Sequence, residues 1–189
     1  MLTFAKNPPI LSPEVLSPRE LHGTWRVAHT KARFEKAFAS DLRSRGVAYF
    51  LPLIERITFS GGRKRRTLFP LFPSYVFFCG SEEDRYRALS TDRLCQVIEV
   101  GDQDEFISEI SDLHKAIGIN PRLDLYPVAI VGQKYRIAGG SFEGLEGVVV
   151  RVNGSTRIVL QVGILGQGAS MEIDAELLEP ADCDDDIAA

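Results

Sequence analysis

The stretch LFPLFPSYVFF, residues 68–78, holds five aromatic rings and two prolines in eleven residues and carries no charge. Its last four residues are all apolar, which is typical of a buried strand. On a strand, Tyr75 and Phe77 share one face while Val76 and Phe78 share the other. We expect one face to pack on a helix of the same domain and the other to stay open as an apolar patch for another protein. Helices covering both faces are the alternative.

A basic run lies just before this stretch: Arg63, Lys64, Arg65 and Arg66 follow Gly61-Gly62. The glycine pair predicts a flexible hairpin tip, from which four cations can reach a phosphate backbone. If all four engage, binding should fall with salt at a log–log slope of roughly −3 to −4. A solvated turn is the alternative. The run has no accompanying ladder of aromatic rings, so readout of single-stranded bases is not implied.

The flanking sequence alternates strands and helices. Residues 25–29 alternate apolar and polar side chains, as a strand does. Phe34, Phe38 and Leu42 recur at helical spacing, and Gly46 is placed to end that helix. Residues 82–89 and a second amphipathic segment from Phe106 to Ile117 predict two more helices. This mixture predicts an α+β domain in which an antiparallel sheet carries flanking helices.

The chain changes character at Gly118. The segment GINPRLDLYP indicates a linker, and the sequence after it turns all-β. Asn153-Gly154, between two β-branched runs, is a strong hairpin signal. Several short strands in about 50 residues predict a small SH3-like β-barrel. We therefore predict five segments: a flexible leader (1–21), the α+β domain (22–117), a linker (118–128), the barrel (129–180) and an acidic tail (181–189).

Composition bounds the possible functions. The 189 residues carry a net charge of −4, but residues 22–100 hold 14 bases and 8 acids, so the first domain is basic. The N-terminus lacks the apolar core of a signal peptide, and no apolar run approaches the about 20 residues that span a bilayer. Three cysteines without metal-ligand spacing favour a reducing compartment. We expect a cytoplasmic protein that does not bind membranes.

No group of residues predicts catalysis. The three histidines are scattered, and neither a nucleophile elbow nor a Walker loop is present. The glycine-rich segment 140–147 precedes a β-branched strand rather than a helix, so we interpret its glycines as turn residues with positive φ. We expect no catalytic residue, no metal site and no cofactor.

Both halves resemble the NusG family of transcription elongation factors. In the first half, the resemblance rests on the strand at residues 25–29, the Phe34-Glu35 pair, the Gly-Gly-basic tip and the F-P-x-Y-hydrophobic run at residues 72–77. In the second, residues 131–152 match the G-x-F-x-G-x-x-G-hydrophobic run of a KOW domain, and residues 164–174 match its closing strands. The resemblance covers residues 23 to about 180, and the two halves occur in the family's order.

The resemblance implies a monomeric factor bound to RNA polymerase through the clamp helices of the largest subunit. It also implies contact with upstream or non-template DNA and a KOW domain that binds ribosomal protein S10 or termination factor Rho. By position, the polymerase-binding residues would be Trp25, Phe34, Pro73, Tyr75 and Phe77. The DNA-binding residues would be Arg33, Lys36, Arg43, Arg63, Lys64, Arg65 and Arg66. The KOW contact would involve Phe142, Ile164 and Leu165, although the family often has an aromatic residue at the position of Leu165.

Within the family, residues 51–55 and 70–73 resemble the specialised RfaH-type paralogs, which prevent pausing or termination on selected operons. The KOW half is closer to the general factor, and its β-branched strands favour a permanent barrel. We expect a specialised paralog. A housekeeping NusG, a ribosome- or RNA-associated KOW protein and an enzyme with an unrecognised site remain as alternatives.

Overall fold

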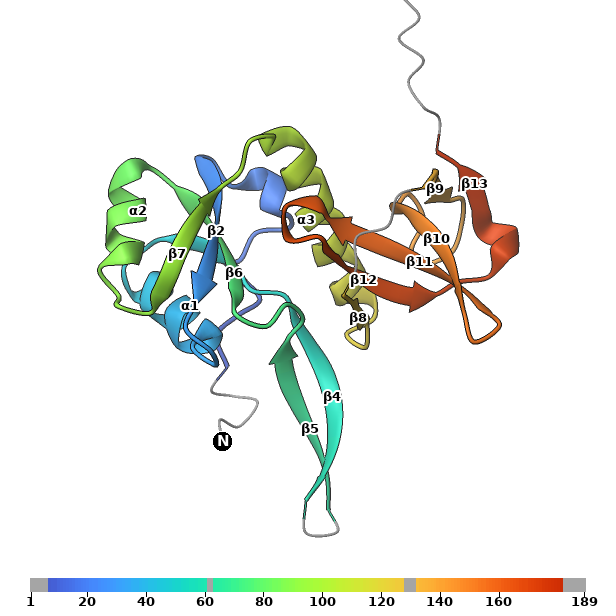
Figure 1. Ribbon diagram of the computed structural model, residues 1–189, viewed down its shortest axis with the longest axis horizontal. Coiled ribbons are helices and arrows are strands. Elements are labelled where there is room, and N and C mark those ends of the chain that lie inside the picture. Colours follow the sequence, from blue (N-terminus) through green and yellow to red (C-terminus); the bar gives the residue numbers. More distant parts are fainter. Residues whose placement is uncertain (1–6, 61–62, 128–131, 182–189) are drawn as a thin grey trace, which may run out of the picture. The chain divides into compact units, whose positions relative to one another are not determined.

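The computed structural model describes residues 7–60, 63–127 and 132–181. The chain divides into two compact units, Met1–Leu123 and Asp124–Ala189. Each unit has its own sheet, shown in Figure 1.

The first unit is built on a five-stranded antiparallel sheet. Its strand order is β1 (Leu11–Ser12), β3 (Ala48–Phe50), β6 (Tyr75–Gly80), β2 (Thr24–Thr30) and β7 (Leu94–Glu99). The apolar strand predicted from residue 75 onward is β6, which lies at the centre. The four inner residues of β6 are all buried, so side chains on both of its faces are covered.

Three helices cover the two faces of this sheet (Figure 1). Helices α1 (Glu35–Ser44) and α2 (Glu82–Leu89) pack on the face that carries Val76 and Phe78. Helix α3 (Gln103–Ile119) packs on the other face, where the rings of Phe77 and Phe106 lie 5.4 Å apart. The α+β fold is confirmed. The prediction that one face of the central strand stays open is wrong, because a helix packs on each face.

The helix ends follow ordinary capping chemistry. Gly46, with φ +72°, follows α1 as predicted. Ser81 and Asp84 form a reciprocal capping box at the start of α2, and the Asp102 side chain accepts a hydrogen bond from the backbone N–H of Glu105 at the start of α3. None of the helices within the described ranges is long and apolar enough to cross a membrane.

The N-terminal segment belongs to the fold from residue 7 onward, so the prediction of a flexible leader over 1–21 is wrong there. Strand β1 pairs with β3, and the backbone N–H of Leu51 donates to the Ile10 carbonyl at 2.7 Å. Leu11 is 4% exposed. The physical reason is that β3 would otherwise present an unpaired edge, which β1 occupies. Residues 1–6 lie outside the described residues.

A separate hairpin is formed by β4 (Leu53–Ser60) and β5 (Arg63–Pro70), which pair only with each other in the described sheets. Figure 1 shows it extending away from the first sheet. The predicted basic run is the first half of β5. The predicted glycine tip, residues 61–62, lies outside the described residues.

The second unit is a six-stranded antiparallel sheet, consistent with the predicted small β-barrel. Its order is β13 (Leu178–Pro180), β9 (Lys134–Ile137), β10 (Glu146–Val152), β11 (Ser155–Val162), β12 (Gln167–Glu172) and β8 (Asp124–Tyr126). Strand β8 lies inside the predicted linker 118–128, whose first two residues belong to α3. The predicted tail begins at Ala181, which is buried, and residues 182–189 lie outside the described residues.

The glycines of segment 140–147 have two different roles. Gly140 and Gly144 have φ of +81° and +83°, as predicted for turn residues. Gly147 does not, and its prediction is corrected. A Cβ at Gly147 would lie 2.5 Å from the Val159 carbonyl oxygen, so the close approach of β10 and β11 requires glycine there.

Candidate functional site

The first unit contains a hollow of about 450 Å³ where the start of α1 meets the base of the β4–β5 hairpin. Its lining residues come from three segments: the start of α1, the hairpin base and the loop before β6. They are Arg33, Glu35, Lys36, Arg56, Thr67, Leu68, Phe69, Pro70 and Pro73. We call this site the hairpin-base hollow.

Two strained backbone positions lie at this hollow: Arg33 lines it, and Ser74 directly follows the lining residue Pro73. Arg33 and Ser74 both have φ of +67°, a region that residues with side chains rarely adopt. The buried Glu35 carboxylate accepts the Ser74 backbone N–H at 2.6 Å, and the Ser74 carbonyl accepts the Thr30 N–H at 2.8 Å. These bonds attach the loop containing Pro73 to α1 through Glu35 and to β2 through Thr30. Such strain clusters at functional sites, where the surrounding structure maintains it.

Lys36 ties the hairpin to α1. Its Nζ donates to the Leu68 carbonyl at 2.6 Å across the hollow's wall. Burial lowers the pKa of the Lys36 ammonium, and the neighbouring Glu35 carboxylate opposes that effect. The hollow therefore has a wall fixed by side-chain bonds rather than by continuous secondary structure.

The chemistry of the hollow is mixed. Its apolar side chains, those of Leu68, Phe69, Pro70 and Pro73, come from the hairpin base and the following loop. Its rim is cationic, and the Arg56 guanidinium lies 5.8 Å from the centre of the Phe69 ring. The one acidic lining residue, Glu35, is buried and engaged with Ser74. This arrangement suits an apolar protein surface flanked by acidic side chains.

Two of the five predicted polymerase-binding residues are corrected. Trp25 and Phe77 are each 0% exposed and pack against Phe106 of α3, at ring distances of 6.3 and 5.4 Å. They are core residues because α3 covers the face of the sheet on which they lie. Neither ring reaches a surface that a partner could contact.

The other three predicted residues are at least partly exposed, but they do not form one site. Pro73 is exposed and lines the hollow. Phe34 is exposed beside the Arg93 guanidinium, 5.1 Å from the ring centre, and half-buried Tyr75 stacks on His29 at 5.1 Å. Neither Phe34 nor Tyr75 lines the hollow.

Sequence reasoning missed most of the hollow's apolar lining and the Arg56 side chain. One signal was available in the sequence. If β5 is extended through all eight of its residues, alternation places Thr67 and Phe69 on one face, and pairing with β4 places Arg56 on the same face. The sequence could not predict that this face lies next to α1, because that depends on the direction in which the hairpin leaves the sheet.

The predicted DNA-binding residues fall into three places. All four residues of the basic run are exposed on β5, and Arg66 also pairs with Glu55 at 3.4 Å. Arg33 and Lys36 line the hollow. Arg43 is exposed near the far end of α1, seven residues beyond Lys36 and so about 10 Å further along the helix axis.

In the second unit, the predicted partner-binding residues occupy two loops. Phe142 is half-buried between β9 and β10, and half-buried Ile164 and Leu165 form a short turn between β11 and β12. Because these four strands are consecutive and antiparallel, both loops lie at the same end of the sheet.

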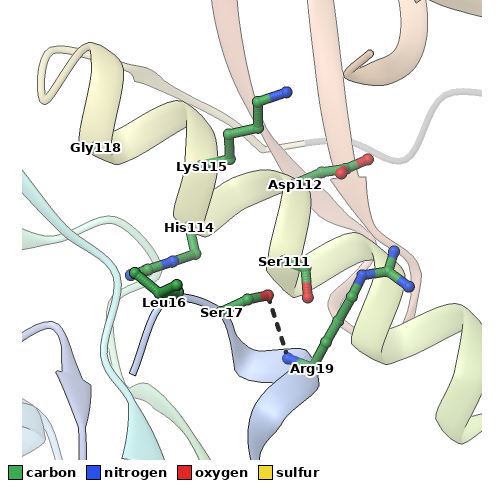
Figure 2. Close-up of a pocket in the computed structure, with 8 residues that line it drawn as sticks. All are labelled: Leu16, Ser17, Arg19, Ser111, Asp112, His114, Lys115 and Gly118. Carbon is green, nitrogen blue, oxygen red and sulfur yellow. Dashed lines mark hydrogen bonds between the residues drawn. The ribbon is translucent and has the colours of Figure 1, made fainter. Parts of the chain in front are cut away.

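A second hollow, of about 350 Å³, separates the N-terminal segment from α3 (Figure 2). Ser17 and Arg19 line one side, and Ser111, His114 and neighbouring α3 residues line the other. Arg19 donates to the Ser108 hydroxyl at 2.9 Å, and the Ser17 hydroxyl accepts the Arg19 backbone N–H at 3.3 Å. The bond between Arg19 and Ser108 attaches the N-terminal segment to α3. Among the described residues, no group of histidine, cysteine or acidic side chains could hold a metal ion.

Comparison with known proteins identifies the class of the first unit. A family model described as transcription termination factor nusG matches residues 23–113, which contain the five-stranded sheet from β2 onward, the hairpin and most of α3. Residues 23–113 of the first unit are therefore similar to the NusG family of transcription factors.

Two solved structures also match the chain at low identity. Thermotoga maritima NusG, solved in a study of its domain interaction, is 17% identical with a TM-score of 0.45, over 84% of this chain and 97% of that one. The MjSpt4:Spt5 complex is 15% identical with a TM-score of 0.27, over 83% of this chain and 97% of the matched chain. No curated protein matches the chain significantly.

Proposed function

We propose that this protein is a transcription elongation factor that holds RNA polymerase through the hairpin-base hollow. The observation that carries the proposal is the hollow itself, about 450 Å³, inside the domain that the NusG family model matches. Members of that family act with RNA polymerase, and we assign the helical hairpin of the polymerase clamp as the occupant.

The chemistry of the hollow supports this assignment. Its apolar residues can bury a partner's aliphatic side chains, and Arg33, Lys36 and Arg56 can pair with acidic residues beside them. The strained loop at Ser74 is held in place before any partner arrives. A preformed surface of this kind loses little conformational entropy on binding.

The mechanism we propose is geometric. The domain holds the clamp while its basic hairpin reaches the upstream or non-template DNA. It then suppresses pausing or termination by binding the processive state of the polymerase more tightly than the paused state. A bound factor shifts such an equilibrium only by its difference in affinity for the two states.

The second unit supplies a further contact in this proposal. We assign it as a KOW domain that binds ribosomal protein S10 or Rho through Phe142, Ile164 and Leu165. The protein acts as a cytoplasmic monomer on selected operons, as a specialised paralog, with a housekeeping NusG as the alternative. The antiparallel sheet at residues 124–180 is consistent with a KOW domain.

The test is a polymerase-binding measurement on single variants of the hollow. Phe69→Ala and Arg56→Ala should each weaken binding of purified core polymerase about tenfold, because each removes a lining side chain. Phe34→Ala and Tyr75→Ala are matched controls, since these rings are accessible in the same domain but lie outside the hollow.

The controls also allow the proposal to fail. Full binding by both hollow variants, with loss of binding in the Phe34 or Tyr75 variant, would place the contact at the residues assigned from sequence instead. Co-purification of the intact protein with ribosomal RNA and without polymerase would reject the elongation-factor proposal altogether.

A further inference from the structure

The hollow between the N-terminal segment and α3 is formed by two separate parts of the sequence (Figure 2). One wall consists of Leu16, Ser17 and Arg19, and the other consists of residues of α3. The family model starts at residue 23, so the first wall comes from sequence outside the matched domain. The volume of about 350 Å³ lies at the lower end of the range of about 300–1,000 Å³ that is typical of small-molecule sites. We call this site the α3 hollow.

The α3 hollow is lined by cationic side chains from both walls. Arg19 comes from the N-terminal segment, and Lys115 comes from α3. The Arg19 side chain is already oriented, because its guanidinium donates to the Ser108 hydroxyl at 2.9 Å. A guanidinium has several N–H donors, so this bond leaves others for a ligand.

Neutral polar groups of the α3 hollow also have unused hydrogen-bonding capacity. The Ser17 hydroxyl accepts the Arg19 backbone N–H at 3.3 Å, so its own proton is left to donate. The Ser111 hydroxyl donates to a carbonyl of the preceding helical turn at 2.6 Å, so its lone pairs are left to accept. Within the described ranges, neither nitrogen of the half-buried His114 ring has a hydrogen-bond partner. Together these groups indicate a polar ligand.

The charges restrict the class of that ligand. Arg19 and Lys115 outnumber the single acidic lining residue, Asp112, so the complementary ligand is an anion. A phosphate group accepts several charge-assisted hydrogen bonds at once, and the planar fork of arginine matches its geometry. The Asp112 carboxylate repels a bare phosphate and only accepts hydrogen bonds, so it favours a ligand that also carries hydroxyl groups. A phosphorylated sugar has both kinds of group.

We propose that the α3 hollow binds a sugar phosphate, either free or as part of a nucleotide. Arg19 and Lys115 hold the phosphate, while Asp112 and the serine hydroxyls hold the sugar. The ligand joins the N-terminal segment to α3. Because that segment also supplies β1, binding stabilises the strand that pairs with the edge of the first sheet. The inference does not depend on polymerase binding, since the two hollows share no lining residue.

The first experiment is isothermal titration calorimetry of the full-length chain with ribose 5-phosphate. Ribose and orthophosphate each lack one half of this compound, and each should bind about tenfold more weakly or less. Adenosine 5′-monophosphate distinguishes the two sources of the same chemistry. Tighter binding than that of ribose 5-phosphate identifies a nucleotide as the ligand, and weaker binding identifies a free sugar phosphate.

Variants of the cationic residues test the phosphate contact. Arg19→Gln and Lys115→Gln should each weaken binding of ribose 5-phosphate about tenfold, because each removes a charge beside the phosphate. Ser108→Ala removes the bond that orients Arg19 but keeps the guanidinium, so a smaller loss there separates charge from local structure. Arg43→Gln is the matched control, since this exposed cation of the same unit lines neither hollow, and it should change nothing.

A variant of the acidic residue tests the sugar contact. Asp112→Ala should weaken binding of ribose 5-phosphate but strengthen binding of orthophosphate, because it removes both a hydroxyl acceptor and a charge that repels the anion. A general loss of structure would weaken the binding of both ligands.

Amide hydrogen exchange reports where the ligand binds. Saturating ribose 5-phosphate should slow exchange at Glu20 and Leu21, whose N–H groups donate to the Ser17 and Pro18 carbonyls at 3.0 and 3.1 Å. Exchange in β11 of the second unit should not change.

Several results would overturn the inference. These are absence of binding by ribose 5-phosphate, full affinity of both Arg19→Gln and Lys115→Gln, or unchanged exchange at Glu20 and Leu21. Equal affinity for orthophosphate and ribose 5-phosphate would reject the sugar phosphate in favour of a general oxyanion site.

Discussion

Phe77 and Tyr75 lie two residues apart on one face of β6, yet the packing around them differs. Phe77 is enclosed by Phe50, Phe72 and Phe106, while Tyr75 is half-buried and stacks on His29. The difference follows from position along the strand: Phe77 is well inside β6, while Tyr75 begins it, next to the Ser74 turn. Side-chain alternation identifies their shared face but not the depth of each residue beneath α3.

Truncation of these two rings should separate core from surface. Phe77→Ala is expected to lower the free energy of unfolding by about 3–5 kcal/mol, because it leaves a cavity among the surrounding rings. Tyr75→Ala should cost about 1 kcal/mol or less, since it removes only a stacked, half-buried ring. Urea denaturation of both variants provides the measurement. Equal losses would mean that Tyr75 is buried in solution.

The stability of the first unit should depend on pH through His114. Burial lowers the pKa of its imidazole below the ordinary 6.5, and its ring lies edge-on to Phe50 at 5.6 Å. Well above pH 6.5 the imidazole is neutral in both the folded and the unfolded chain and does not change the free energy of unfolding. As the pH falls below that value, the unfolded chain binds a proton before the folded chain does, so stability decreases until the folded pKa is reached.

The expected slope is at most about 1.4 kcal/mol per pH unit within this window. Urea denaturation at several pH values below 7 should show a steeper loss of stability in the natural chain than in His114→Asn, which cannot titrate. Parallel pH profiles for the two proteins would contradict the assignment to His114.

Sequence periodicity predicted the helices and strands whose apolar residues recur over several helical turns or several strand alternations. The α3 pattern from Phe106 to Ile117 and the Asn153-Gly154 turn are confirmed. Strands β1 and β8 were missed because two or three residues carry no periodicity, and each forms only against an edge supplied by distant sequence. The hollow was not predictable for the same reason: its walls come from α1, the hairpin and a loop.

The two-residue strand β1 should contribute more than its length suggests. Deletion of residues 1–13 removes the pairing with β3 and the buried Leu11 side chain. We expect the free energy of unfolding to fall by about 2–3 kcal/mol, mainly from the lost apolar burial. Deletion of residues 1–6 alone, compared in the same urea denaturation, isolates the contribution of residues 7–13. Equal stability of the two truncated proteins would show that β1 does not hold the edge of the sheet.

For the whole molecule, the boundary between the units follows from strand pairing rather than from proline content. The predicted linker ends at residue 128, yet β8 at Asp124–Tyr126 pairs with β12, and Arg157 binds Asp124 at 2.6 Å. The prolines at 121 and 127 therefore bracket an edge strand of the second sheet. Proline commonly marks the ends of strands as well as linkers, so composition did not distinguish the two.

Two fragments test this boundary. The fragment 124–189 should fold by itself, because it contains all six strands of its sheet. The fragment 129–189, cut at the predicted domain start, lacks β8 and exposes the edge of β12. It should unfold at a lower urea concentration and lose amide-exchange protection at residues 168–170, which face β8. Identical protection in the two fragments would mean that β8 contributes nothing to the second unit, and the boundary would then return to residue 129.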